Sequence, residues 1–176
     1  MKVHLGCGKR NFGTDWVHVD KVDYPHVTWR DVTKLPYPKQ SCDLIYASHL
    51  LEYFDRVEVV QVLEEWLRVL KPGGTLRLAV PNFEAICLMY GRGISLDKLI
   101  GPLYGKWGSP PVYHKTVYDF DSLERVLTSA GFSEVRLYDW RETEHAQHDD
   151  HSQAYLPHME KETGTLISLN VEALKL

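Results

Sequence analysis

The chain has 176 residues, of which 44% are hydrophobic and 25% charged, a composition typical of one globular domain over residues 1–176. Its formal net charge of −4 gives no basic surface, so we expect no nucleic-acid partner. No apolar run reaches the roughly 18 residues of a membrane span, and the three cysteines form no CxxC pair. We therefore expect a cytoplasmic protein without a membrane partner, and the sequence predicts no oligomeric state.

The chain opens with an apolar segment that runs into two glycines. Residues 3–5 predict a short strand, and Gly6-Cys7-Gly8 follows at once. Glycine has no Cβ, so the backbone can turn sharply and approach a ligand closely. Open α/β sheets bind ligands at the carboxyl ends of their strands, which makes this turn a candidate binding element.

Three further strands are predicted before the first helix, over residues 16–19, 27–29 and 43–47. Only residues 9–15 separate the glycine turn from the next strand, which is too short for an ordinary crossover helix. The second strand ends at Asp20, and the third ends near Asp31. The fourth is almost continuously apolar, as expected for a strand buried on both faces.

Helices and strands alternate in the middle of the chain. A capping-box sequence beginning at Asp55 precedes apolar residues at helical spacing, and a Lys-Pro-Gly-Gly segment at 71–74 ends this helix. A strand over 75–80 and a helix over 83–90 follow. A second capping-box sequence begins at Asp121 and predicts a helix that ends at Gly131.

Two segments do not fit the alternation. Residues 91–111 are rich in glycine and proline, and we interpret them as an insertion rather than a core element. Strands are predicted over 135–140 and 165–174, and the polar segment between them, residues 141–163, is long for a loop. Loops of this length are often functional or disordered.

The order of elements predicts an α/β fold, and six short pieces of sequence now carry a resemblance. Together they resemble class I S-adenosylmethionine-dependent methyltransferases, of the small-molecule subgroup called type 11, over most of residues 2–140. The resemblance implies a Rossmann-like three-layer sandwich around a mostly parallel seven-stranded sheet with an antiparallel last strand. The first crossover helix is expected to be reduced. The pieces are residues 4–8, Asp20, residues 31–36, 42–53, 69–74 and 130–132.

The resemblance implies S-adenosylmethionine as the cofactor. The Asp20 carboxylate is expected to accept hydrogen bonds from the two ribose hydroxyls, and Asp31 from the adenine amino group. Turn capping by Asp20, and solvation of Asp31 and Arg10, are the alternatives. The predicted cofactor residues are Leu5, Gly6, Cys7, Gly8, Arg10, Asp20, Asp31, Val32, Ser48 and His49.

Methyl transfer needs proximity and orientation, and a hydroxyl acceptor also needs a base. His114 is the proposed base, because an imidazole titrates near neutral pH; a hydrogen-bonded structural histidine is the alternative. We expect residues 91–118 and 141–163 to lie on the acceptor side. We predict no metal site, because the histidine-rich segment matches no standard zinc motif. The predicted substrate contacts are Tyr53, Asn82, Tyr113, His148 and His151.

The sequence thus predicts methyl transfer from S-adenosylmethionine to a small polar acceptor. One alternative is a non-catalytic protein that binds S-adenosylmethionine or S-adenosylhomocysteine. The other is a nucleotide-dependent oxidoreductase. An oxidoreductase that binds a dinucleotide would need the fingerprint GxGxxG. Here that fingerprint is incomplete, because Asn11 occupies the position of its third glycine, and the oxidoreductase is therefore disfavoured.

Overall fold

The computed structural model describes residues 1–108, 112–158 and 160–176. Seven strands of the described residues form one sheet, in the order β3-β2-β1-β4-β5-β11-β8. Strand β11 runs antiparallel to both of its neighbours, and the pairs among β1 to β5 are parallel. The predicted fold class is therefore confirmed. The strands are β1 (Lys2–Leu5), β2 (Trp16–Val19), β3 (Val27–Trp29), β4 (Cys42–Ser48), β5 (Leu70–Pro81), β8 (Ser133–Leu137) and β11 (Ser168–Leu174).

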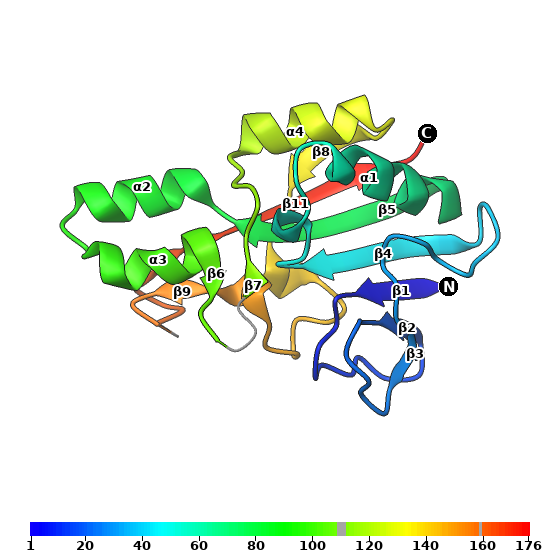
Figure 1. Cartoon of the computed structure of the whole chain (residues 1–176), viewed down its shortest axis with the longest axis horizontal. Coiled ribbons are helices and arrows are strands. Elements are labelled where there is room, and N and C mark those ends of the chain that lie inside the picture. Colours follow the sequence, from blue (N-terminus) through cyan, green and yellow to red (C-terminus); the bar gives the residue numbers. More distant parts are fainter. Residues whose placement is uncertain (109–111, 159) are drawn as a thin grey trace.

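Helices α1 (Glu58–Val69) and α4 (Phe120–Ser129) cover one face of this sheet (Figure 1). Helix α1 buries a stripe of apolar side chains at helical spacing against the apolar face of β4 and β5. Asp55 and Glu58 exchange the two bonds of a capping box: Asp55 Oδ1 accepts from the Glu58 N–H at 2.9 Å, and Glu58 Oε2 accepts from the Asp55 N–H at 3.1 Å.

The second predicted capping box is wrong by two residues. Asp119, not Asp121, caps α4: its Oδ1 accepts from the Ser122 N–H at 2.8 Å, and Ser122 Oγ accepts from the Asp119 N–H at 3.0 Å. The Ser122 hydroxyl here performs the role that a glutamate or glutamine has in the usual capping box. The helix begins earlier, and Phe120 packs against the main core.

Two predicted strands end differently from the expectation. Strand β8 stops at Leu137, and Trp140 lies in the short 3-10 helix η2 (Trp140–Glu142). The predicted strand over 165–174 is split into β10 (Thr165–Leu166) and β11, because the Ile167 N–H donates to the Ala154 carbonyl, outside the large sheet. Strand β5 starts at Leu70, before the predicted breaker at 71–74, and continues through it, with Gly73 at a φ of +76°.

The predicted insertion contains a helix that the sequence pattern did not indicate. Helices α2 (Phe83–Gly91) and α3 (Leu96–Tyr104) lie beyond the arrowheads of β4 and β5 (Figure 1). They enclose a small separate core of Ile86, Met89 and Leu99. Strands β6 (Gly105–Lys106) and β7 (Val112–Tyr113) pair after α3, and residues 109–111 of the predicted insertion lie outside the described residues.

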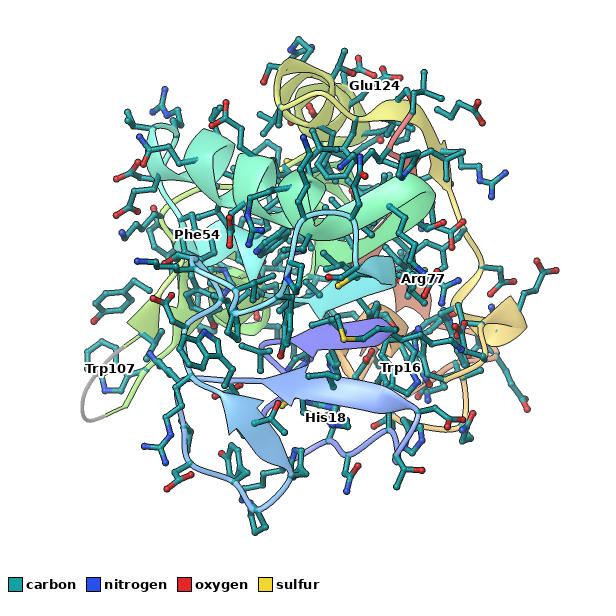
Figure 2. All side chains as sticks on the ribbon, turned by 90° about the vertical axis from the view of Figure 1, so that its right-hand side faces the viewer. Trp16, His18, Phe54, Arg77, Trp107 and Glu124 are labelled. Carbon is teal, nitrogen blue, oxygen red and sulfur yellow. The ribbon has the colours of Figure 1, made fainter. Side chains whose placement is uncertain are left out.

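The opposite face of the sheet carries many polar side chains and a small apolar cluster of Phe12, Trp16, Leu44 and Tyr46, and it is covered by residues 138–158 and 160–167. This segment includes η2, the 3-10 helix η3 (His151–Gln153), β9 (Tyr155–Leu156) and β10. Figure 2 shows Trp16 and Arg77 on this side of the sheet. Residues 6–41 contain no helix, which confirms the reduced first crossover. The register aligns a row of polar side chains across six strands: His18, His4, Tyr46, Arg77, Glu172 and Arg136.

A bilayer-spanning helix is not present: across the described ranges, none is both long and apolar enough.

Candidate functional site

The glycine turn after β1 has the geometry of a close-approach loop. Gly6 and Gly8 have φ angles of +63° and +56°, a region that L-residues with a side chain rarely adopt. The Gly6 N–H donates to the Val19 carbonyl at 2.8 Å, which fastens the turn to the end of β2. A Cβ on Gly6 would also meet the Leu50 side chain at 3.1 Å. Gly6 is thus required by both backbone conformation and space.

The structure brings Asp20 to this turn. Asp20 Oδ2 accepts from the Gly8 N–H at 2.8 Å, and Oδ1 accepts from the Val22 N–H at 2.8 Å. Asp20 therefore caps a turn, which was the predicted alternative to ribose binding. The two roles are compatible, because each carboxylate oxygen retains a second lone pair that can accept from a hydroxyl.

Asp31 and Val32 follow β3, the strand at one edge of the sheet. Asp31 is exposed, and its Oδ1 accepts from the N–H and the hydroxyl of Thr33 at 2.8 and 2.6 Å. The Thr33 hydroxyl lowers the pKa of Asp31, so the carboxylate is ionised at neutral pH. Val32 packs against the main core, and its carbonyl accepts from the Trp66 indole at 2.8 Å. The turn is therefore anchored while the Asp31 carboxylate stays accessible.

Leu5 and Cys7 are fully buried beneath the turn. Burial raises the pKa of the Cys7 thiol to about 12, so Cys7 has no thiolate character at neutral pH. His26, which sequence reasoning missed, has its Nε2 3.1 Å from the Gly8 carbonyl and 3.7 Å from Cys7 Sγ. Arg10 Nε donates to the Asp149 carbonyl at 2.8 Å and thus connects the turn to the 141–163 loop.

Strand β4 ends at the same edge, with Ser48 and His49. Ser48 is buried, and its hydroxyl has no hydrogen-bond partner within residues 1–108, 112–158 and 160–176. His49 has a φ of +49°, and its N–H donates to the Ala79 carbonyl at 2.7 Å. Its Nε2 lies 3.2 Å from Ser168 Oγ, and its ring lies 5.1 Å from that of His151.

Glu52 is the buried titratable residue that sequence reasoning missed. Its side chain is 0% exposed, and Oε1 lies 3.7 Å from both His49 Nδ1 and His114 Nε2. Among the described residues, neither carboxylate oxygen has a hydrogen-bond partner. Burial raises the pKa of Glu52 to about 8. The sequence offered one signal for a buried acid: Glu52 is a single carboxylate between apolar residues, shortly after a buried strand.

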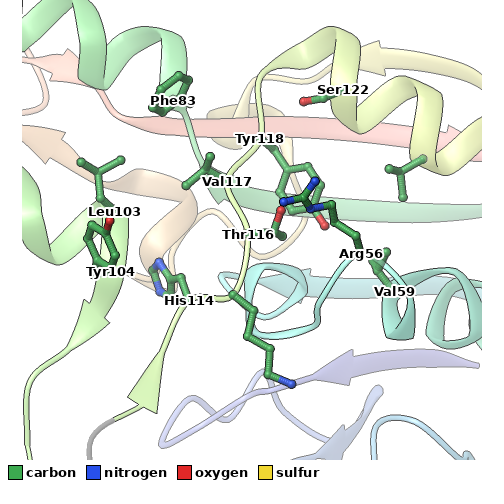
Figure 3. Close-up of a pocket in the computed structure, with 12 residues that line it drawn as sticks. Arg56, Val59, Phe83, Leu103, Tyr104, His114, Thr116, Val117, Tyr118 and Ser122 are labelled. Carbon is green, nitrogen blue, oxygen red and sulfur yellow. The ribbon is translucent and has the colours of Figure 1, made fainter.

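His114, the predicted base, lies at the edge of a cavity of about 710 Å³. Its imidazole is 6% exposed, and Nδ1 lies 3.2 Å from the Pro102 carbonyl. Burial lowers the pKa of His114. Figure 3 shows the ring beside Leu103 and Tyr104, across the 114–118 segment from Arg56. The residues of the glycine turn and Asp20 do not line this cavity.

The predicted substrate residues separate into two groups. Tyr53 and His151 lie next to the two histidines that face Glu52. The Tyr53 ring is 4.9 Å from that of His114, and His151 is beside His49. Asn82, Tyr113 and His148 lie elsewhere. Asn82 caps α2 by accepting from the Ala85 N–H at 3.2 Å, Tyr113 is exposed in β7, and the ring of His148 stacks on Phe12 at 4.7 Å.

Residues 4–78 match the model of the type 11 family described as "Methyltransferase domain". The chain is 31% identical over 117 residues to a demethylmenaquinone methyltransferase from Protochlamydia amoebophila, a match that covers 61% of this chain. It covers 47% of that relative, so the chain spans about half of the relative's length.

Solved methyltransferases share the fold at low sequence identity. A SAM-dependent methyltransferase from Archaeoglobus fulgidus is similar at a TM-score of 0.62 and 16% identity, over 99% of this chain and 85% of that chain. Human N-acetylserotonin methyltransferase in complex with SAM is similar at a TM-score of 0.58 and 15% identity, over 99% of this chain and 47% of that chain.

The sequence match begins at His4, within β1, and ends at Leu78, within β5, so it contains the glycine turn, Asp20 and Glu52. The strand order and the antiparallel β11 complete the same fold. Over residues 4–78 the chain is similar in sequence to the type 11 methyltransferase family, and over the described residues it shares the fold of solved SAM-dependent methyltransferases.

Proposed function

We propose that this protein transfers a methyl group from S-adenosylmethionine to a small polar acceptor. The observation that carries the proposal is the position of Asp20. Its carboxylate is fixed beside the glycine turn by the Gly8 N–H, at the edge of the sheet where β4 delivers Ser48 and His49. A carboxylate with free acceptor capacity and a turn with two glycines, at the same edge of the sheet, suit an adenosine ligand with an amino-acid tail.

The residues present fit this cofactor. Asp20 has acceptor capacity left for the ribose hydroxyls, and the exposed, ionised Asp31 is free to accept from the adenine amino group. The glycine turn leaves room for the amino-acid part, with Arg10 available for its carboxylate. When bound, S-adenosylmethionine supplies an electrophilic methyl group on a sulfonium. The protein supplies orientation, which accounts for much of the acceleration of an in-line displacement.

The acceptor is proposed to approach from the side of residues 91–118 and 141–163. Segment 141–163 contributes His151, which lies beside His49, and segment 91–118 contributes His114. Arg10 is bonded to the Asp149 carbonyl, so the cofactor turn and this loop are directly connected. These contacts support an acceptor site between the two segments and the end of β4.

Calorimetry with S-adenosylmethionine, S-adenosylhomocysteine and NAD tests the cofactor. We expect both sulfur ligands to bind and NAD not to bind. Absence of binding by either sulfur ligand at millimolar concentration would overturn the proposal. Mass-spectrometric detection of methylated products, with a panel of hydroxyl and amine acceptors, then distinguishes an enzyme from a non-catalytic binding protein.

A further inference from the structure

Two imidazoles face one buried carboxylate oxygen next to the predicted cofactor edge. Oε1 of Glu52 lies 3.7 Å from Nδ1 of His49 and 3.7 Å from Nε2 of His114. We call these three residues the histidine–glutamate triad. His49 comes from the end of β4, Glu52 from the 3-10 helix η1 (Leu51–Tyr53), and His114 from the residue after β7. The triad thus spans segments that are far apart in the sequence.

Hydrogen bonds on one side of the triad fix the tautomer of His49. Asn170 Nδ2 donates to the Ser152 carbonyl at 2.9 Å, so the Asn170 amide oxygen faces Ser168 and accepts its hydroxyl proton at 2.9 Å. The Ser168 oxygen must then accept from His49 Nε2 at 3.2 Å, because its only proton is already donated. His49 therefore carries its proton on Nε2 and presents the lone pair of Nδ1 to Glu52.

A hydrogen bond on the other side of the triad fixes the tautomer of His114. A carbonyl oxygen can only accept, so the contact of 3.2 Å with Pro102 places a proton on His114 Nδ1. The lone pair of Nε2 then faces Glu52. An ionised Glu52 would set its negative charge against two lone pairs in a site without exposure to water. A protonated Glu52 removes that charge, and its O–H can form a hydrogen bond to either imidazole after a small shift that shortens the 3.7 Å separation.

We propose that Glu52 is a positioning residue that holds one proton between His49 and His114, and that this triad takes up the proton released when an O–H or N–H acceptor is methylated. This role rests on the proposed function. It also narrows the acceptor to a hydroxyl or an amine, because an acceptor without a proton to lose would leave the triad unused.

The chemical step balances on this arrangement. The acceptor oxygen or nitrogen forms the bond to the methyl carbon, the carbon–sulfur bond breaks with its electron pair on sulfur, and the acceptor proton passes to the triad. With that added proton, Glu52 becomes a carboxylate whose Oε1 accepts from N–H groups on both His49 and His114. The sulfonium loses one positive charge and the triad gains one, so the net charge of the buried site does not change.

The groups around the triad are consistent with this assignment. Burial, then the neighbouring His151, His114 and Arg10, lower the pKa of His49, while burial raises the pKa of Glu52 to about 8. The pKa values of Tyr53 and Tyr118 are raised by burial and by the nearby Glu52, so both phenols stay protonated at neutral pH. His114 is also near His151, which lowers its pKa further after burial. At neutral pH the proton therefore stays on Glu52.

Nuclear magnetic resonance of the full-length protein tests the triad without knowledge of the acceptor. Long-range proton–nitrogen spectra should show an unprotonated Nδ1 in His49 and an unprotonated Nε2 in His114 at pH 7. The carboxyl carbon of Glu52 should titrate near pH 8. In Glu52→Gln the tautomers should persist, because an amide N–H can replace the acid proton, while the titration near pH 8 should disappear. The exposed Glu64→Gln on α1 is the matched control and should change neither signal.

A Glu52 that titrates near 4.5, its ordinary value, or a His49 protonated on Nδ1, would overturn the shared proton. Calorimetry with S-adenosylhomocysteine separates this outcome from failure of the proposed function. If the triad is observed but the ligand does not bind, the methyl-transfer role is overturned. If both hold, Glu52→Gln should bind the ligand normally and lose at least tenfold in kcat toward a hydroxyl acceptor; an unchanged kcat and pH–rate profile would overturn the role of Glu52.

Discussion

The carboxylate of Asp20 accepts a hydrogen bond from the backbone N–H of Gly8 at 2.8 Å, and so ties the end of β2 to the turn after β1. The same side chain is the proposed ribose ligand. One carboxylate thus has an observed structural role and a proposed binding role, and a substitution must be chosen to separate them.

Asp20→Asn keeps an oxygen that can accept from the Gly8 N–H but removes the negative charge. We expect the affinity for S-adenosylhomocysteine to fall by about 2 kcal/mol, as for other hydrogen bonds to charged groups. Isothermal calorimetry measures this loss directly. The exposed Asp15→Asn, in the loop before β2, is the control and should bind like the native protein. Native affinity in Asp20→Asn would mean that the ribose is held by another residue.

Gly6→Ala and Gly8→Ala separate backbone strain from loss of space. Both residues have positive φ, so alanine should cost about 1–2 kcal/mol at either position. Only at Gly6 would the added Cβ press on Leu50, at 3.1 Å. We therefore expect a larger fall in melting temperature for Gly6→Ala than for Gly8→Ala. Equal falls would show that Leu50 moves aside at no cost.

The buried acid predicts an unusual pH dependence of stability. Between 4.5 and about 8 the unfolded chain releases the Glu52 proton while the folded chain keeps it, so Glu52 lowers the free energy of unfolding as pH rises through this window. At pH 7 the cost is about 3 kcal/mol. Urea unfolding of Glu52→Gln and the native protein at pH 5 and pH 8 should show that the variant is relatively more stable at pH 8. If the difference in free energy of unfolding between the two proteins is the same at pH 5 and pH 8, the folded pKa of Glu52 is near its ordinary value.

His49 and His114 make the free energy of unfolding depend on pH in the opposite direction. Burial lowers the pKa of both His49 and His114, so they stabilise the fold above their ordinary value of 6.5 and this stability is lost as pH falls below it. The native protein and Glu52→Gln contain the same histidines, so their comparison removes the part of the histidine contribution that does not depend on Glu52.

Arg77 should be far more important for stability than Arg136, although both contact Glu172. Arg77 is 13% exposed and donates to Glu172 at 2.7 Å and to Glu144 at 2.7 Å, whereas Arg136 is 66% exposed and lies at 3.2 Å. We expect Arg77→Leu to cost about 3 kcal/mol, since it leaves Glu172 without its buried partner. Arg136→Leu should cost less than about 1 kcal/mol. Urea unfolding measures both, and similar losses would contradict the importance of burial here.

The sequence predicted the short strands β2 and β3 over residues 16–19 and 27–29, where the structure has them, and Asp20 and Asp31 follow their ends. It failed where a side chain outside the pattern determines the boundary. Asp119 caps α4 because Ser122 completes the capping box, and α3 forms despite Pro102 within it. At α4 a second local pair of hydrogen bonds outweighs the expected capping box, and at α3 packing against α2 outweighs the proline.

The site shows the same division. Asp20 and the glycine turn carry a local motif, and the structure brings them together as expected, although their binding roles remain proposals. Glu52 lies within the piece 42–53, but nothing in that piece marks it as a site residue, because its significance comes from His114, which is far away in the sequence. Burial and long-range proximity of this kind are properties of the fold and cannot be predicted from spacing.

Strand β11 lies between β5 and β8, although it follows both of them in the chain. Neither β5 nor β8 can complete its pairing until residues 168–174 have been synthesised. The same strand carries Ser168 and Asn170, which orient His49. The glycine turn can therefore form before β11 is made, whereas His49 is oriented only when β11 enters the sheet between β5 and β8. If the proposed triad is correct, completion of the sheet also completes the site.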